Sequence, residues 1–166
     1  ILVLYLKQSF NWSPELASLT FVVVGIIAMI VQGGLIGPLV NLFGEWKLTL
    51  AGIGFVILGC LLLPMASPSN AIPTVFTAVA ILALGTGLVT PCLRALVSKR
   101  LKSNNQGTVL GSLQGLQSLG TFIGAAMAGI FYDLLGAKSP FFGTTIILLI
   151  VIILIARNPA NKQLRT

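Results

Sequence analysis

Histidine is absent from this 166-residue sequence, and acidic residues are scarce, with three Asp and Glu against ten Lys and Arg. Without histidine, no Ser-His-Asp triad can be assembled, and a common zinc ligand is missing. The two cysteines, Cys60 and Cys92, fall inside apolar runs, which argues against a disulfide framework and a paired-cysteine zinc site. No phosphate-binding Gly-x-x-x-x-Gly-Lys-(Ser/Thr) motif occurs. We therefore expect no enzyme, no metal site and no cofactor.

Charge of either sign is also scarce. Only 8% of the residues are charged and 56% are hydrophobic, whereas a soluble domain carries roughly 25% charged residues. So few charges cannot cover a water-facing surface, so most of the outside must face the lipid bilayer. The net charge of +7 would suggest nucleic acid in a soluble protein. In a membrane protein, basic residues instead set the orientation of the spans across the bilayer, so no nucleic-acid partner is expected.

Long apolar runs are what the sequence does have. Crossing the hydrocarbon core takes about 20 residues of helix, and we place spans at about 15–40, 47–66, 72–97, 108–135 and 140–156. Residues 1–6 are apolar, without the basic start or cleavage site of a signal peptide, and are expected to end a preceding span. The runs are too long for strands and lack their alternation. The predicted fold is all-α, a polytopic transmembrane helical bundle.

The basic residues predict the orientation of these spans. If the loop holding Lys7 is outside, only Lys7 and Lys138 remain there. The other eight basic residues then fall inside: Lys47, Arg94, Lys99, Arg100, Lys102, Arg157, Lys162 and Arg165. Because positive residues are retained in the cytoplasm, we expect a multi-pass protein of the plasma (inner) membrane with a cytoplasmic C-terminus.

An eight-residue pattern, Gly-x-x-x-(Asn/Asp)-Leu-x-Gly, occurs twice. It ends the first span at Gly37, Asn41 and Gly44, and ends the fourth at Gly129, Asp133 and Gly136. The first copy is expected inside and the second outside. Two three-helix units related by an inverted repeat would produce this arrangement, which recurs in secondary transporters. A chance match among abundant Gly and Leu is the alternative.

Charged side chains within the membrane are the first place to look for ion coupling. No charge falls near the centre of a predicted span, so a coupling acid would lie outside this chain. Arg94 lies about one turn from the inner end of its span, where its side chain can reach the interface. Arg94 could therefore serve as a topogenic anchor or as a contact in a cytoplasmic gate, and the sequence leaves both roles open.

Small and polar residues share one side of the fourth span. Gly107, Gly111 and Gly115 recur every four residues, which permits another helix to approach closely. At about 100° per residue, Gln114, Gln117 and Thr121 join that side. Buried glutamines need hydrogen-bond partners, so bonding between helices and a polar pathway for substrate both remain open.

Two other spans supply further pathway candidates. Gln32 precedes a glycine pair in the first span, and Gly85, Thr86 and Thr90 lie in the third. Pro91 follows Thr90 and frees a backbone carbonyl, which weakens the helix near its inner half. Helices softened in this way line transport cavities, although a tolerated packing kink explains the same residues.

Two stretches resemble a known family. Residues 37–47, which include Glu45 and Lys47, resemble the loop motif G-x-L-A-D-R-x-G-R-K of the major facilitator superfamily, and residues 91–98 and 106–113 are similar to the helix-ten to helix-eleven region of tetracycline exporters. The loop copy departs from the motif, with Asn41 for Asp, Leu42 for the first Arg and Glu45 for the second. Glu45 is expected to pair with Lys99 or Arg100 instead.

The resemblance covers essentially the whole chain and implies the C-terminal half of such a transporter, from the end of helix seven through helix twelve. It implies a missing N-terminal six-helix half as partner, with Gln106 and Gly107 facing a carboxylate of that half. It also implies secondary active transport, as proton-coupled efflux of small amphipathic molecules or drugs. Uptake of a sugar, amino acid or organic anion, and a non-transporting scaffold with a transporter-derived fold, are the alternatives.

Overall fold

A computed structural model describes residues 1–99 and 106–157, and all regular structure within these ranges is helical. The elements are α1 (Leu2–Phe10), α2 (Pro14–Ile30), the π-helix η1 (Val31–Leu35), α3 (Ile36–Phe43), α4 (Glu45–Leu62), the 3-10 turn η2 (Leu63–Met65), α5 (Ala71–Ser98), α6 (Gln106–Leu135) and α7 (Ser139–Arg157). The all-α prediction is confirmed.

Four helical stretches in the described ranges are long and apolar enough to cross a membrane. They are Pro14–Phe43, Glu45–Met65, Ala71–Ser98 and Gly107–Leu135. The fifth expected span corresponds to α7, whose apolar part, Ser139–Ile155, is shorter. The four stretches agree with the first four expected spans to within a few residues, because length and hydropathy alone determine where such helices lie.

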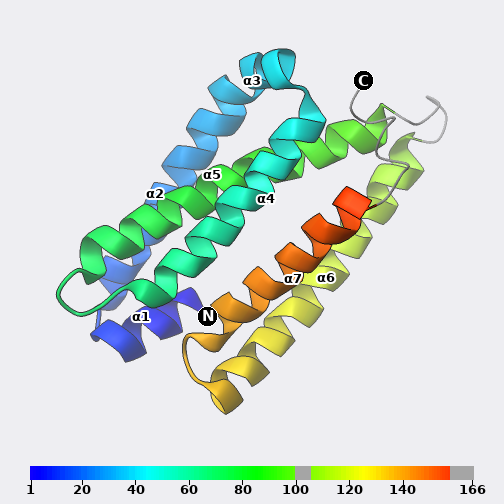
Figure 1. The fold of residues 1–166 in the computed structure, drawn as a ribbon. Helices are drawn as coiled ribbons and strands as arrows, with labels where there is room; N and C mark the ends of the chain where they lie inside the picture. The colour runs from blue at the N-terminus through cyan, green and yellow to red at the C-terminus, as the bar shows by residue number, and fades with distance from the viewer. Residues whose placement is uncertain (100–105, 158–166) are drawn as a thin grey trace.

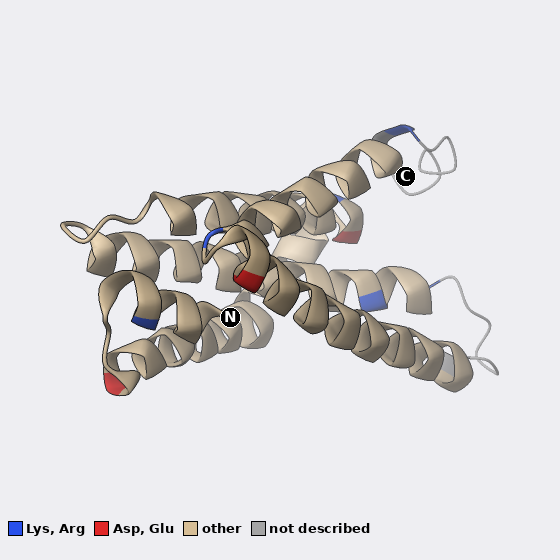
Figure 2. Ribbon diagram, turned by 90° about the horizontal axis from the view of Figure 1, so that it is seen from below, with Lys and Arg blue, Asp and Glu red and all other residues tan. Residues whose placement is uncertain are grey.

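Successive long helices run in alternating directions (Figure 1). The turn between α3 and α4 and the C-terminal end of α5 lie at one end of the bundle, which we call the α3–α4 end. Helix α1 and the turns after α4 and α6 lie at the other, which we call the α1 end. The few charged residues mostly lie near helix ends (Figure 2).

Helices α4 and α5 pack with their backbones in close approach, and glycines make this possible. A Cβ added to Gly52 would lie 2.9 Å from the carbonyl oxygen of Gly85, and one added to Gly85 would lie 2.7 Å from that of Gly52. One turn or more away, a Cβ on Gly59 would lie 2.9 Å from the carbonyl oxygen of Ala78. Cβ atoms do not approach other atoms within 3.0 Å, so only glycine fits at these three positions.

The first span agrees with the expected residues 15–40 but contains a π-helical turn that the sequence did not predict. At η1 the N–H of Ile36 donates to the carbonyl of Val31, five residues back, as in a π-helix. Downstream, Pro38 has no N–H to donate, and a proline ring clashes with the carbonyl four residues earlier, here that of Gly34. The wider turn through Gly33 and Gly34 lies directly before that proline, and α3 then continues to Phe43.

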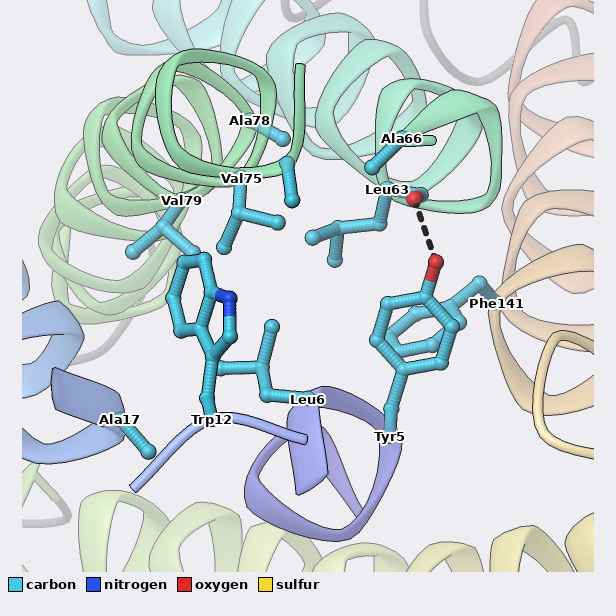
Figure 3. Packing of buried hydrophobic residues seen from close by; sticks show 11 residues of the cluster. Tyr5, Leu6, Trp12, Ala17, Leu63, Ala66, Val75, Ala78, Val79 and Phe141 are labelled. Carbon is cyan, nitrogen blue, oxygen red and sulfur yellow. Dashed lines mark hydrogen bonds between the residues drawn. The ribbon is translucent and has the colours of Figure 1, made fainter. Parts of the chain in front are cut away.

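Aromatic and aliphatic side chains form a core at the α1 end (Figure 3). Tyr5 and Leu6 on α1 are fully buried, and the Tyr5 hydroxyl donates to the carbonyl of Leu63 at 2.8 Å. The Tyr5 ring also meets that of Phe141 edge to face, with centroids 5.1 Å apart. Helix α1 is therefore anchored to η2 and α7, and it extends beyond the expected residues 1–6.

Helix α6 differs sharply from α4 and α5 in burial. No residue of Gly107–Leu135 is buried by the described part of the chain, and only 11% of the most apolar stretch of Pro14–Phe43 is buried. The corresponding stretch of α4 is 44% buried. The described chain therefore covers α2 and α6 much less than it covers α4.

Candidate functional site

A polar cluster joins α5 to α6 toward the α3–α4 end of the bundle. Arg94 lies one turn before the end of α5, and its Nη2 donates to Gln114 Oε1 at 2.6 Å and to Gln117 Oε1 at 3.4 Å. Because a guanidinium can only donate, each glutamine must turn its amide oxygen toward Arg94. The structure thus brings Arg94 together with two glutamines that the sequence analysis placed in a different candidate group. We call them the Arg94 cluster.

Two open cavities flank this cluster. One, of about 440 Å³, is lined by Arg94, Ala95, Ser98, Leu110, Leu113 and Gln114. The other, of about 340 Å³, is lined by Val89, Thr90, Leu93, Arg94, Leu113, Leu116 and Gln117. Arg94 and Leu113 line both. Each cavity is apolar apart from a few polar groups and falls in the size range of small-molecule sites, roughly 300–1,000 Å³.

An ion pair closes the α4–α5 contact at the same end of the bundle. Lys99, which caps the C-terminus of α5, donates to the carboxylate of Glu45 in the first turn of α4. The expected pairing of Glu45 with Lys99 is confirmed, and the alternative partner, Arg100, lies outside the described residues. Lys99 is two-thirds exposed, so this pair contributes at most about 1 kcal/mol to stability.

The remaining pathway candidates have different surroundings. Thr90 lines the cavity beside Arg94, whereas Thr86 and Thr121 donate to carbonyls of their own helices, those of Leu82 and Gln117. Gly85 is buried against α4, which supports the packing alternative for this residue over a place on an open pathway. Gln32 is exposed within η1.

The glycine stripe of α6 has no neighbour in this part of the chain. A Cβ on Gly107, Gly111 or Gly115 would meet no described atom within 4 Å. The predicted close approach of another helix therefore has no partner among residues 1–99 and 106–157, and it stays a prediction. Gln106 begins α6, but its side chain lies outside what the structure describes.

The two copies of the repeated pattern end their helices in the same way. Gly44 and Gly136 have positive φ angles of 79° and 93°. Each donates its N–H to the carbonyl four residues earlier, that of Val40 at 2.9 Å and that of Tyr132 at 3.1 Å. Because side chains rarely adopt this conformation, both copies need glycine here. Asn41, Lys47 and Asp133 are exposed, and the inverted relation of the two units stays a prediction.

Sequence reasoning missed one polar contact at the α1 end. The hydroxyl of Tyr132, on α6, donates to Gln8 Oε1, on α1. The available signal was a hydroxyl-bearing aromatic near the end of an apolar span, since such a group usually finds a partner. This contact lies near the C-terminal end of α6, whereas the Arg94 cluster joins the N-terminal half of α6 to α5.

Known proteins match the chain over most of its length. The family model of the Major Facilitator Superfamily matches residues 1–165. The class C tetracycline resistance protein of Escherichia coli is 31% identical over 130 residues, which are 78% of this chain and 32% of that protein. The Hippocampus abundant transcript 1 protein of Homo sapiens is 32% identical over 130 residues, which are 78% of this chain and 26% of that protein.

A third relative, Multidrug resistance protein 2 of Bacillus subtilis, is 29% identical over 131 residues, which are 79% of this chain and 32% of that protein. No solved structure gives a significant match. The chain spans about a quarter to a third of the length of these curated relatives. With a family model matched from end to end over four apolar helices, the chain belongs to the Major Facilitator Superfamily.

Proposed function

We propose that this chain is the C-terminal half of a secondary active transporter that exports small amphipathic molecules in exchange for protons. The observation that carries the proposal is the Arg94 cluster, a polar group between two cavities on membrane-spanning helices. Relatives named for resistance to tetracycline and to multiple drugs support export over uptake. Transport needs no chemical conversion, which agrees with a sequence that has no histidine.

A second six-helix half is the proposed partner of the open helices. Helix α6 carries its glycine stripe on a surface that the described chain leaves uncovered. In alternating access, two halves rock about a central site, and the surfaces that slide past each other must be held together without deep interdigitation. Small residues allow that. The proposed coupling acid would belong to the other half, because no carboxylate of this chain lies in the middle of a span.

The proposed orientation places the α3–α4 end in the cytoplasm of the plasma (inner) membrane. Lys47, Arg94, Lys99 and Arg157 lie on helices toward that end, while Lys7 and Lys138 lie toward the α1 end. An impermeant maleimide applied to intact cells should label a cysteine at position 138 and not one at position 102, which lies outside the described residues. Equal labelling of both would contradict the orientation.

The test of function uses the full-length protein that contains this chain. Reconstituted in proteoliposomes with an imposed proton gradient, it should accumulate a fluorescent amphipathic drug against its concentration gradient and dissipate the proton gradient as it does so. A protonophore should abolish accumulation. Uptake of a sugar or amino acid without drug transport would favour the uptake alternative. Absence of any substrate-dependent proton flux would favour a membrane scaffold.

A further inference from the structure

Arg94 carries a positive charge that forms no ion pair with an acidic side chain in residues 1–99 and 106–157. The sequence contains three acidic side chains, Glu15, Glu45 and Asp133. Glu45 is occupied by Lys99, and the other two lie at the start of α2 and near the end of α6, both toward the α1 end. A cation on a membrane-spanning helix whose charge is not paired by an acidic side chain is a candidate functional group.

The cluster presents hydrogen-bond donors and few acceptors. Both hydrogen bonds of Arg94 within the described residues use Nη2, which leaves the N–H groups on Nε and Nη1 for a ligand. The amide oxygens of Gln114 and Gln117 accept hydrogen bonds from Arg94, so each glutamine presents its NH₂ group to a ligand as a donor. Thr90 and Ser98, in the walls of the two cavities, add hydroxyl groups. A site of this kind favours an anionic oxygen over a neutral or cationic group.

Apolar side chains continue from the donors on both sides. Leu110 and Leu113 line the larger cavity, and Leu93, Leu113 and Leu116 line the smaller one. An inorganic anion would leave these surfaces without a partner. A molecule with one anionic group and an apolar body would satisfy the donors and cover the leucines at once.

We propose that the Arg94 cluster and its two cavities recognise the anionic group of an amphipathic organic anion, such as a carboxylate on an aromatic body. This assignment names the substrate class of the proposed exporter and rests on that function. Arg94 binds the anionic oxygens with the free side of its guanidinium, Gln114 and Gln117 hold that guanidinium across α5 and α6, and the leucines contact the apolar body.

The test compares two probes of equal size that differ in charge, naphthoate and naphthamide. Binding to the full-length protein in a neutral maltoside detergent is followed by quenching of tryptophan fluorescence at neutral pH. The wild type should bind naphthoate at least about tenfold more tightly than naphthamide, the gain expected of charge-assisted hydrogen bonds. Arg94→Gln should abolish the difference by weakening naphthoate alone. Arg157→Gln removes an arginine at the same end of the bundle, on α7, and should keep the difference.

A second variant guards against misfolding of Arg94→Gln. Gln114→Glu keeps the size of the side chain and places a carboxylate 2.6 Å from Arg94, so the protein's own anion would occupy the site. It should remove the preference for naphthoate while leaving the protein monodisperse. Equal affinity of the wild type for both probes, or a preference that survives both variants, would overturn the proposal.

Further measurements distinguish a lipid phosphate from a substrate as the source of the anion, and distinguish failure of the anion site from failure of the exporter proposal. If short-chain phosphatidylglycerol abolishes naphthoate binding to the wild type, the site holds a lipid phosphate and the substrate assignment is wrong. If proton-coupled drug export is intact in the wild type but naphthoate binding is unchanged by Arg94→Gln, the anion site is refuted and the exporter stands. If naphthoate binding depends on Arg94 but no substrate drives proton flux, the anion site stands and the exporter is refuted.

Discussion

Gly52 and Gly54 lie two residues apart in α4 and face different surroundings, which makes them a matched pair for testing the α4–α5 contact. A Cβ on Gly52 would lie 2.7 Å from Val89 Cγ2 and 2.9 Å from the carbonyl oxygen of Gly85, whereas one on Gly54 would meet nothing within 4 Å. The valine is β-branched and cannot easily rotate away. The carbonyl belongs to the backbone of α5, so relief requires the two helices to separate.

The expected magnitude follows from these contacts. Overpacking of one methyl group against a rigid neighbour costs about 1–3 kcal/mol. Gly54→Ala adds the same methyl group to the same helix without a clash. In both variants, helix propensity favours alanine over glycine by up to about 1 kcal/mol. About 2–4 °C of melting temperature corresponds to each kcal/mol in a domain of roughly 150–250 residues, and a longer protein shifts less. Because both variants share this gain in helix propensity, the difference between them is the cost of the clash, and Gly52→Ala should melt below Gly54→Ala by at most roughly 2–12 °C.

The measurement is thermal unfolding of the full-length protein in detergent, followed by tryptophan fluorescence. Because membrane proteins commonly unfold irreversibly, all variants must be heated at one fixed rate so that apparent melting temperatures can be compared. Wild type, Gly52→Ala and Gly54→Ala should rank with Gly52→Ala lowest. If the two variants melt together, the close approach of α4 and α5 at Gly85 is refuted.

Other changes test separate features of the chain. Tyr5→Phe leaves the buried carbonyl of Leu63 without its hydrogen bond and should cost about 1–3 kcal/mol in the same unfolding assay; an unchanged melting temperature would contradict the anchoring of α1. Glu45→Lys should lower stability by no more than about 1 kcal/mol, because Lys99 is largely exposed. The charge reversal should also impair transport, and adding Lys99→Glu should restore it; failure of that rescue would argue against the ion pair. Gly107→Leu should impair transport while membrane insertion, measured by fractionation, stays normal, because its Cβ meets no described atom of this chain; normal transport would refute an interface there.

Helix positions were the most predictable part of the structure. The apolar runs and the turn residues after them gave the ends of α4 and α5 to within a few residues, because a bilayer imposes both length and composition on a span. The interruption at η1 was not predicted. Hydropathy does not respond to one extra residue in a turn, although the adjacent Gly33 and Gly34 before Pro38 were a signal that the backbone could widen there.

Contacts between helices were less predictable than the helices themselves. The Arg94 cluster depends on how α5 and α6 are rotated about their axes, and no run of hydropathy reports that rotation. The partial signal was that Arg94 and Gln114 lie on either side of one connection, each within about two to three turns of it, so an antiparallel pair brings them toward the same end of the bundle. The glycines of α6 have no neighbour in the described chain, whose close backbone contacts are made instead by Gly52, Gly59 and Gly85.

The π-helical turn of the first span alters how every later position on that span should be plotted. A helical wheel drawn at a constant increment from Pro14 to Phe43 goes out of phase after Leu35 by the angle of the one inserted residue, about 100°. Scanning mutagenesis across this span would show periodic sensitivity that breaks and restarts at the glycine pair. Asn41 is thereby turned to a side of the cylinder that an uninterrupted α-helix would assign to other residues.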